Sequence, residues 1–302
     1  MTIRRFGVDI SKYNGNVNMR VAKQSGVEFV ILKAGSGARG EDPYFQTNYR
    51  NAKAAGMPVG AYWYSYAMNV NEAKGEAIRF MKLLDGKQFE YPVYLDFEDP
   101  SQRNISRSTK TDMAIAFMDI LEKNGYYTGL YSSGDWINNK FDRARMKNYD
   151  VWIAHWYVNV PRCYRSYGMW QYTNKKQVPG VPSTGEGGVD ANYAFIDYPS
   201  IIKNAGFNGY TKLKSKSGGD NMKNKNIIIA YWNDGDLANA QALSNSLPGA
   251  ALVRTKDASI YKEDYVIQVG GFDIKGSNRK VFGRNRLATL EEVTKVAKEL
   301  KA

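Results

Sequence analysis

The sequence of 302 residues predicts an α/β fold, a TIM-like barrel of strands and helices followed by a small C-terminal α/β domain. Strand-like and helix-like segments alternate over residues 1–205. The expected strands are apolar along most of their length, which is typical of a parallel sheet covered on both faces. Between residues 206 and 224 the composition changes to Gly, Lys, Ser and Asn, which predicts a flexible linker before a domain over 225–302.

The expected elements of the first domain follow one another in a regular order. The strands are Val27–Ala34, Pro58–Tyr66, Tyr91–Phe97, Thr128–Ser132, Val151–Trp156 and Gly168–Tyr172, and the helices are Tyr44–Ala55, Asn71–Leu84 and Thr109–Asn124. Glycines follow these helices closely, as C-terminal caps do. A closed barrel would place its ligand site at the carboxyl ends of the strands. An open doubly wound sheet is the alternative, and the lack of a dinucleotide-binding glycine fingerprint disfavours it.

The C-terminal domain has a strand and helix pattern of its own. Its expected strands are Ile227–Tyr231, Ala251–Arg254 and Tyr265–Val269, and its first helix is Asp236–Leu247. A last helix begins at Thr289, where Glu292 completes a capping box three residues later. This pattern predicts a small α/β module.

The single cysteine and the single histidine restrict the chemistry that the chain can carry. Cys163 has no partner for an intrachain disulfide, and one thiol cannot build a structural zinc site. His155 alone excludes histidine-rich metal sites, and no Ser-His triad is expected. We assign neither residue a role, predict no metal and no cofactor, and expect the chemistry to use carboxylates, tyrosines or lysines.

The charge balance points to anionic partners. The net charge is +12 and the isoelectric point is near 9.4, which favours an anionic wall polymer, a membrane surface or a nucleic acid. No segment combines a basic stripe with interleaved aromatic residues, so a nucleic-acid partner is not expected. No apolar run approaches the roughly 20 residues that cross a bilayer. The first residues lack the apolar core of a signal peptide, so synthesis in the cytoplasm is expected.

Two carboxylates close an expected strand. Asp96 and Glu98 are two residues apart in YLDFE, so their side chains share one face of the strand. Two carboxylates in one partly dry cleft repel each other, so one stays protonated and can act as an acid. Asp9 in GVDIS and Asp190 in GVDANY stand at the ends of two more strands. Four carboxylates at the strand ends of one barrel predict an active site on one rim.

Nine segments in order carry a resemblance to a known family. They are GVDIS, ILKAGSG, GAYWYS, YLDFE, GLYSS, VWIAHW, WQYT, VPGV and GVDANY, and they span residues 1 to 198. Together they resemble glycoside hydrolase family 25, the lysozymes of phages, bacteria and some fungi. The resemblance implies a barrel with five helices and eight strands. It also implies cleavage of the β-1,4 bond between N-acetylmuramic acid and N-acetylglucosamine in peptidoglycan.

The same resemblance implies residue roles in the cleft. Glu98 matches the proton donor and Asp96 the second catalytic carboxylate, while Asp9 and Asp190 match acidic residues that hold sugar hydroxyls. Asp96 acts either as a nucleophile or by orienting the acetamide of the substrate for attack, and the short spacing favours the second. A chitinase-like or glucosaminidase hydrolase and a non-catalytic wall-binding barrel remain alternatives.

Aromatic and polar residues in the matching strands are the predicted substrate contacts. Tyr62, Tyr64 and Tyr131 are the first candidates, because about half of the strand residues face the core instead. Lys33 lies in an apolar strand and needs a partner, so we expect it to pair with a cleft carboxylate such as Asp9. Trp152 and Gln171 complete the predicted binding set.

The C-terminal domain is predicted to bind the wall. The segments YVIQVGG and SNRKVFGRNRLATLEEV resemble a clostridial type of cell-wall-binding repeat, although they lack most of its Arg-Tyr-Glu-Thr pattern. A linked wall anchor raises the effective concentration of an enzyme on an insoluble polymer. A dimerisation or purely stabilising domain is the alternative. These features predict a phage-type endolysin that reaches the wall of its host after holin-type release from the cytoplasm.

The linker contains a sequence that can start a second product. Codons GGA-GGT-GAT-AAT-ATG for residues 218–222 would place a ribosome-binding sequence before Met222. This predicts a short product that begins at Met222 and forms a homo-oligomer with the full chain through the C-terminal domain. A glycine-rich linker with a coincidental methionine is the alternative. Synonymous recoding of Gly218 and Gly219 separates the two, because only an internal start loses its short band.

Overall fold

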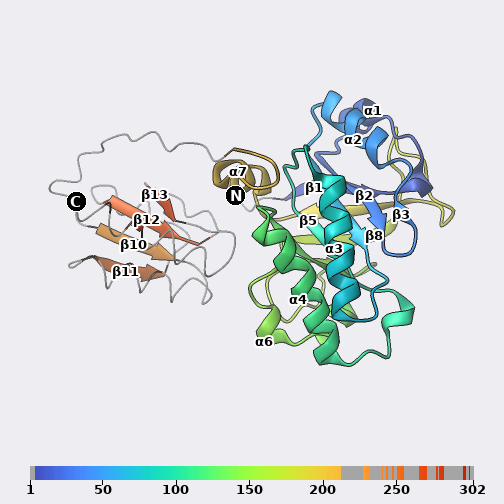
Figure 1. Ribbon diagram of the computed structural model, residues 1–302. Coiled ribbons are helices and arrows are strands. Elements are labelled where there is room, and N and C mark those ends of the chain that lie inside the picture. The colour runs from blue at the N-terminus through green and yellow to red at the C-terminus, as the bar shows by residue number, and fades with distance from the viewer. Residues whose placement is uncertain are drawn as a thin grey trace. The chain divides into compact units, whose positions relative to one another are not determined.

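The chain forms two compact units, Met1–Lys212 and Leu213–Ala302. The computed structural model describes residues 4–211, 227–231, 240, 243, 247, 250–254, 265–270, 277, 279–281, 295, 296 and 299. Figure 1 shows the strands and helices of the first unit and the strands of the second.

The first unit is a closed barrel of eight strands. They are β1 (Arg5–Ile10), β2 (Phe29–Ser36), β4 (Val59–Tyr64), β5 (Val93–Asp96), β6 (Thr128–Ser133), β7 (Asp150–Ala154), β8 (Met169–Lys176) and β9 (Val189–Ala194). The order is β1-β2-β4-β5-β6-β7-β8-β9, and β9 returns to pair with β1. All neighbours are parallel except β9, which is antiparallel to both β8 and β1. A short strand β3 (Gly40–Glu41) adds a hairpin to β2. The predicted barrel is therefore confirmed, and the doubly wound alternative is wrong.

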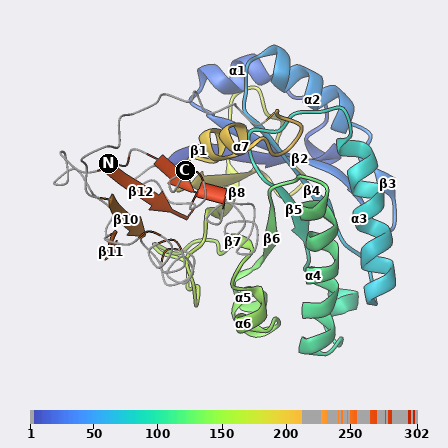
Figure 2. The same ribbon diagram turned by 60° about the vertical axis from the view of Figure 1, so that its left-hand side comes forward.

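Helices cover the outer side of the strands. They are α1 (Met19–Gln24), α2 (Phe45–Ala54), α3 (Val70–Leu84), α4 (Arg107–Lys123), α5 (Gly134–Asn139), α6 (Arg143–Met146) and α7 (Tyr198–Ala205). Figure 2 shows α1, α2, α3 and α4 following one another around the outside of the barrel. Three of the seven helices in residues 4–211 have six residues or fewer, so the implied number of five depends on how short helices are counted. No helix in the described ranges is long and apolar enough to cross a membrane.

Side chains directly before two of these helices cap their first turns. The side chains of Asn69 and Ser106 accept backbone N–H groups at the starts of α3 and α4. Such caps satisfy donors that a helix cannot pair within itself. These capping residues therefore set where the two longest helices begin.

Aromatic rings fill the amino-terminal end of the barrel. Phe29 and Tyr91 stack with ring centroids 4.2 Å apart, and the hydroxyls of Tyr94 and Tyr198 both donate to the Asp150 carboxylate. Gly129 is required beside them, because a Cβ there would lie 2.8 Å from the Tyr94 ring. This packing closes one end of the barrel, so a ligand site belongs at the other.

The barrel extends beyond its predicted boundary at residue 205. Asn208 is fully buried, its amide donates to Tyr91 O, and its Oδ1 accepts the Tyr127 N–H at 2.7 Å. The Tyr210 hydroxyl bonds the Glu90 carboxylate. The first residues of the predicted linker thus belong to the barrel, because their polar side chains pair with backbone and carboxylate groups at its amino-terminal end. The rest of the predicted linker, including Met222, lies outside the described residues and stays a prediction.

The second unit contains a parallel sheet. Its strands β10 (Ile227–Tyr231), β11 (Ala251–Arg254), β12 (Tyr265–Val269) and β13 (Arg279–Val281) pair in the order β11-β10-β12-β13. The first three match the predicted strands. The predicted helices Asp236–Leu247 and the one from Thr289 fall largely outside the described residues. Buried apolar residues of this unit form a core of their own, separate from the barrel core.

Candidate active site

Four carboxylates reach the open end of the barrel from three strands. Asp96 is the last residue of β5, and Glu98 follows it by two positions. Asp9 in β1 lies directly opposite Asp190 in the register of β1 with β9. Asp190 was expected at a strand end, but it is the second residue of β9. Because β9 is antiparallel, its first residues lie at the rim where the parallel strands end.

Strand register places the predicted tyrosines beside these carboxylates. Tyr64, Asp96 and Tyr131 are consecutive partners across β4, β5 and β6. Tyr62 pairs with Lys33 of β2. Burial first, and then the charges of Asp9 and Asp96 among others, raise the pKa of the Tyr62 hydroxyl. The predicted residues therefore gather at one site.

Asp9 is held by two amides below the rim. Gln171 Nε2 donates to Asp9 Oδ2 at 2.9 Å, and Asn192 Nδ2 donates to the same oxygen at 2.8 Å. Asn192 Oδ1 accepts the Trp152 indole N–H at 2.8 Å. Asn192 was not among the predicted site residues, although it lies two positions after Asp190 and therefore on the same face of the strand.

The floor of the site is a network around Gln171. Its Oε1 accepts the Tyr131 hydroxyl at 3.0 Å and the Trp156 indole N–H at 2.8 Å. Gln171 is 2% exposed and Trp152 is 1% exposed. Direct substrate contact was expected of both, but their burial places them beneath the site. They position Asp9 and Tyr131 instead.

The expected ion pair between Lys33 and Asp9 does not form. Lys33 Nζ lies over the ring of Tyr64, 4.7 Å from its centroid, and 5.7 Å from that of Tyr62. Two amides, those of Gln171 and Asn192, bond Asp9 instead. The ammonium acts on Asp96 and Glu98 instead, since its charge lowers the pKa of both carboxyls against the larger effect of burial.

Asp99 is a second residue of the site that was not predicted from the sequence. Tyr64 OH donates to Asp99 Oδ2 at 3.0 Å, while Asp99 Oδ1 accepts the N–H of Ser101 at 2.9 Å. These bonds tie the Tyr64 ring to the residue that directly follows Glu98. Only the adjacency of Asp99 to Glu98 could have suggested this role.

Burial shifts the protonation of all four carboxylates. It raises the pKa of Asp9 to about 6, that of Glu98 to about 7 and that of Asp190 to about 8. The pKa of Asp96 is raised well above its ordinary value by burial and then by the charge of Glu98. The cluster therefore retains protons near neutral pH, as a general acid requires. In the described ranges, no three His, Cys, Asp or Glu side chains could hold a metal ion.

Asp96 has an oxygen without a partner. Its Oδ1 is buried without a hydrogen-bond partner, as are only three other side-chain polar atoms in the part of the chain that the structure describes. A buried carboxylate oxygen without a donor is costly, so such atoms call for an explanation. A substrate N–H or O–H group at this oxygen would satisfy it.

The raised pKa of Asp190 predicts a stability change with pH. A carboxyl whose folded pKa is raised costs no stability below its unfolded pKa, and the cost grows until pH passes the folded pKa. For Asp190 this window runs from 3.8 to about 8. We expect Asp190→Asn to leave the thermal midpoint unchanged near pH 3, below this window, and to raise it by roughly a few °C at pH 8.5. Thermal unfolding followed by circular dichroism measures this, and an equal midpoint at pH 8.5 would contradict the assignment.

The sequence that forms this site matches one family of enzymes. The family model described as "Glycosyl hydrolases family 25" matches residues 8–181, which include the end of β1, the strands β2 to β8 and the Asp96–Glu98 segment. The chain belongs to glycosyl hydrolase family 25. The matched range covers three of the four clustered carboxylates of this family 25 barrel, and Asp190 follows it.

Named relatives of this family 25 chain include lysozymes. It is 27% identical over 180 residues to "Autolytic lysozyme" of Clostridium acetobutylicum, covering 60% of this chain and 54% of the relative. It is 28% identical over 200 residues to "Lysozyme M1" of Streptomyces globisporus, covering 62% of this chain and 66% of the relative. The match to the clostridial enzyme thus spans about half of that protein.

A solved structure shares the fold of the family 25 chain. The crystal structure of the CTP1L endolysin has a TM-score of 0.58 and 24% identity, and the match covers 98% of this chain and 99% of that one. Its description states that the activity of CTP1L is regulated by a secondary translation product.

Proposed function

We propose that this protein is an endolysin-type lysozyme that hydrolyses the β-1,4 bond between N-acetylmuramic acid and N-acetylglucosamine in bacterial peptidoglycan. The observation that carries the proposal is the pair Asp96 and Glu98 at the open end of the barrel. Glu98 has a pKa raised to about 7, so a large part of it is protonated at neutral pH. Glycosidic bonds are cleaved by such an acid beside a second carboxylate.

In this mechanism Glu98 gives its proton to the oxygen of the leaving sugar. Asp96 in its ionised form accepts the acetamide N–H of the substrate at the oxygen that otherwise has no partner. This hydrogen bond favours the charged form of Asp96, so the proton of the pair resides on Glu98. The acetamide oxygen attacks the anomeric carbon as the bond to the leaving sugar breaks. Water then opens the cyclic intermediate, and Glu98 takes up the proton of that water.

Analysis of new reducing ends tests the proposed reaction. Purified Gram-positive walls are incubated with the protein, and the released sugars are reduced and identified. We expect new muramic acid ends, because the scissile bond lies on the reducing side of that sugar. New N-acetylglucosamine ends would make the protein a glucosaminidase, cleavage of chitin with intact walls would make it chitinase-like, and no new ends would favour a non-catalytic barrel.

The proposal includes the second unit and the route to the wall. The unit would bind an anionic wall polymer and hold the barrel on its substrate. Holin-type release from the host cytoplasm would bring the protein to the wall. A short product starting at Met222 would join the full chain in a homo-oligomer, and the description of CTP1L makes this start worth testing by the recoding described above.

A further inference from the structure

Tyr157 has an unusual backbone and an exposed ring. Its φ is 58°, and Tyr157 and Asn208 alone among the non-glycine residues of the described part have a positive φ. Asn208 is an amide residue, which tolerates this conformation, and it is fully buried with its side chain bonded. Tyr157 is not an amide residue, and its side chain is 66% exposed. Strained residues of this kind persist where the surroundings hold them, and they cluster at ligand sites.

Hydrogen bonds hold the Tyr157 ring in place. Its hydroxyl donates to Oδ1 of Asn174, a β8 residue that is 8% exposed. Asn174 Nδ2 in turn donates to Glu186 Oε2 at 2.7 Å. The hydroxyl is therefore tied down while the face of the ring remains open to solvent. Such a side chain loses little further freedom when a ligand packs on it.

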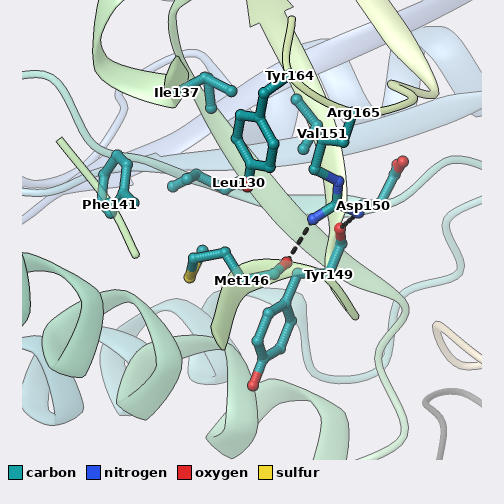
Figure 3. Close-up of a pocket in the computed structure, with 9 residues that line it drawn as sticks. All are labelled: Leu130, Ile137, Phe141, Met146, Tyr149, Asp150, Val151, Tyr164 and Arg165. Atoms are coloured by element: carbon teal, nitrogen blue, oxygen red, sulfur yellow. Dashed lines mark hydrogen bonds between the residues drawn. The ribbon is translucent and has the colours of Figure 1, made fainter. Parts of the chain in front are cut away.

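The loop that carries Tyr157 is anchored at its other end. Asn138 of α5 accepts the Tyr164 N–H at 2.8 Å and donates to Arg162 O at 2.7 Å. The Arg165 guanidinium donates to the carbonyl oxygens of Met146 and Tyr149, and Figure 3 shows it beside Tyr164 against the end of α6. These hydrogen bonds hold the loop in its conformation without a ligand.

Tyr157 stands next to the catalytic rim. Its neighbour Trp156 donates its indole N–H to Gln171, which donates to Asp9. The rings of Trp156 and Tyr157 meet edge to face with centroids 6.5 Å apart, and Trp156 is 38% exposed. One continuous chain of contacts therefore links the exposed ring to the carboxylate cluster.

We propose that the Tyr157 ring is a platform on which a pyranose ring of a long glycan strand stacks, beyond the sugars at the scissile bond. The apolar face of a pyranose fits an open aromatic face, and a tied hydroxyl keeps that face in one orientation. A glycan strand is the expected occupant because the ring adjoins the active site proposed above. The inference therefore rests on the proposed muramidase function.

Cleavage of peptide-free glycan strands tests the platform. The substrates are long glycan strands and a tetrasaccharide, and the variants are Tyr157→Gly and Tyr157→Phe. The control is Ile78→Ala, which truncates an apolar side chain on α3 that is 45% exposed. We expect Tyr157→Gly to lower kcat/KM on long strands about tenfold, mostly through KM, and to change the tetrasaccharide less than about twofold. Tyr157→Phe keeps the ring, so its kcat/KM on long strands is expected to fall less. The thermal midpoint of Tyr157→Gly should stay within about 2 °C of the natural chain, since glycine accepts this φ without strain.

Each other outcome overturns a named part of the inference. Equal losses on both substrates would make Tyr157 a structural residue, and equal losses for the glycine and phenylalanine variants would assign the effect to the hydroxyl. A loss of activity seen only on peptide-bearing walls would mean that a stem peptide, and not a pyranose, packs on the Tyr157 ring. If the natural chain cleaves strands and Tyr157→Gly matches it, the platform is wrong and the proposed function stands. If the natural chain cleaves neither substrate, the proposed function falls and the platform with it.

Discussion

Replacing Glu98 by Gln is expected to slow the hydrolysis of glycan strands by roughly 10²–10⁴-fold. The amide keeps the size of the side chain but cannot give a proton to the leaving oxygen. Initial rates of reducing-end release from peptide-free strands measure the loss. Affinity for the same strands, measured by calorimetry, should change little, because binding does not require the proton.

The pH profile gives an independent check on the same residue. Burial raises the pKa of Glu98 to about 7, and an acid catalyst works only in its protonated form. Activity of the natural chain should therefore fall as pH rises through this value. A Glu98→Gln variant that retains the rate of the natural chain would remove Glu98 from the mechanism, whatever the shape of the profile.

Asp96→Asn is expected to have the second large effect, also a loss of roughly 10²–10⁴-fold in kcat. An asparagine cannot carry the negative charge that polarises the acetamide N–H. The folded protein should not be destabilised at pH 7, because the substitution removes a buried carboxylate whose pKa is raised by burial. A thermal midpoint equal to or above that of the natural chain would show that the lost activity is not lost folding.

The role of Asp96 can be separated from that of a nucleophile. If Asp96 orients the acetamide, mass spectrometry of the protein with a slow fluorinated substrate should find no sugar bound to it. A covalent glycosyl adduct on Asp96 would replace the substrate-assisted scheme by direct attack. The site assignment would survive that result, since both schemes need the same carboxylate.

Much of the barrel could be predicted because its strands carry a local signal. The apolar runs at Val27–Ala34 and Tyr91–Phe97 became β2 and β5 within a few residues at each end. Helices stopped near the glycines that follow them, as expected of capping. The end of the barrel was misplaced, because Asn208 and Tyr210 are polar residues in a Gly-rich and Lys-rich stretch. Only the contacts of these residues show that they belong to the barrel.

The sequence by itself determined that Asp96 and Glu98 stand two positions apart at the end of an apolar segment. The strand β5 ends at Asp96, so Glu98 lies in the loop that follows it and not on the predicted face of the strand. Tertiary structure decided what surrounds them. The antiparallel course of β9 brings Asp190 to the rim opposite Asp9. Lys33 lies over Tyr64 rather than beside Asp9, and Trp152 and Gln171 lie in the floor. These arrangements depend on contacts between strands far apart in the chain, and local patterns of residues do not contain that information.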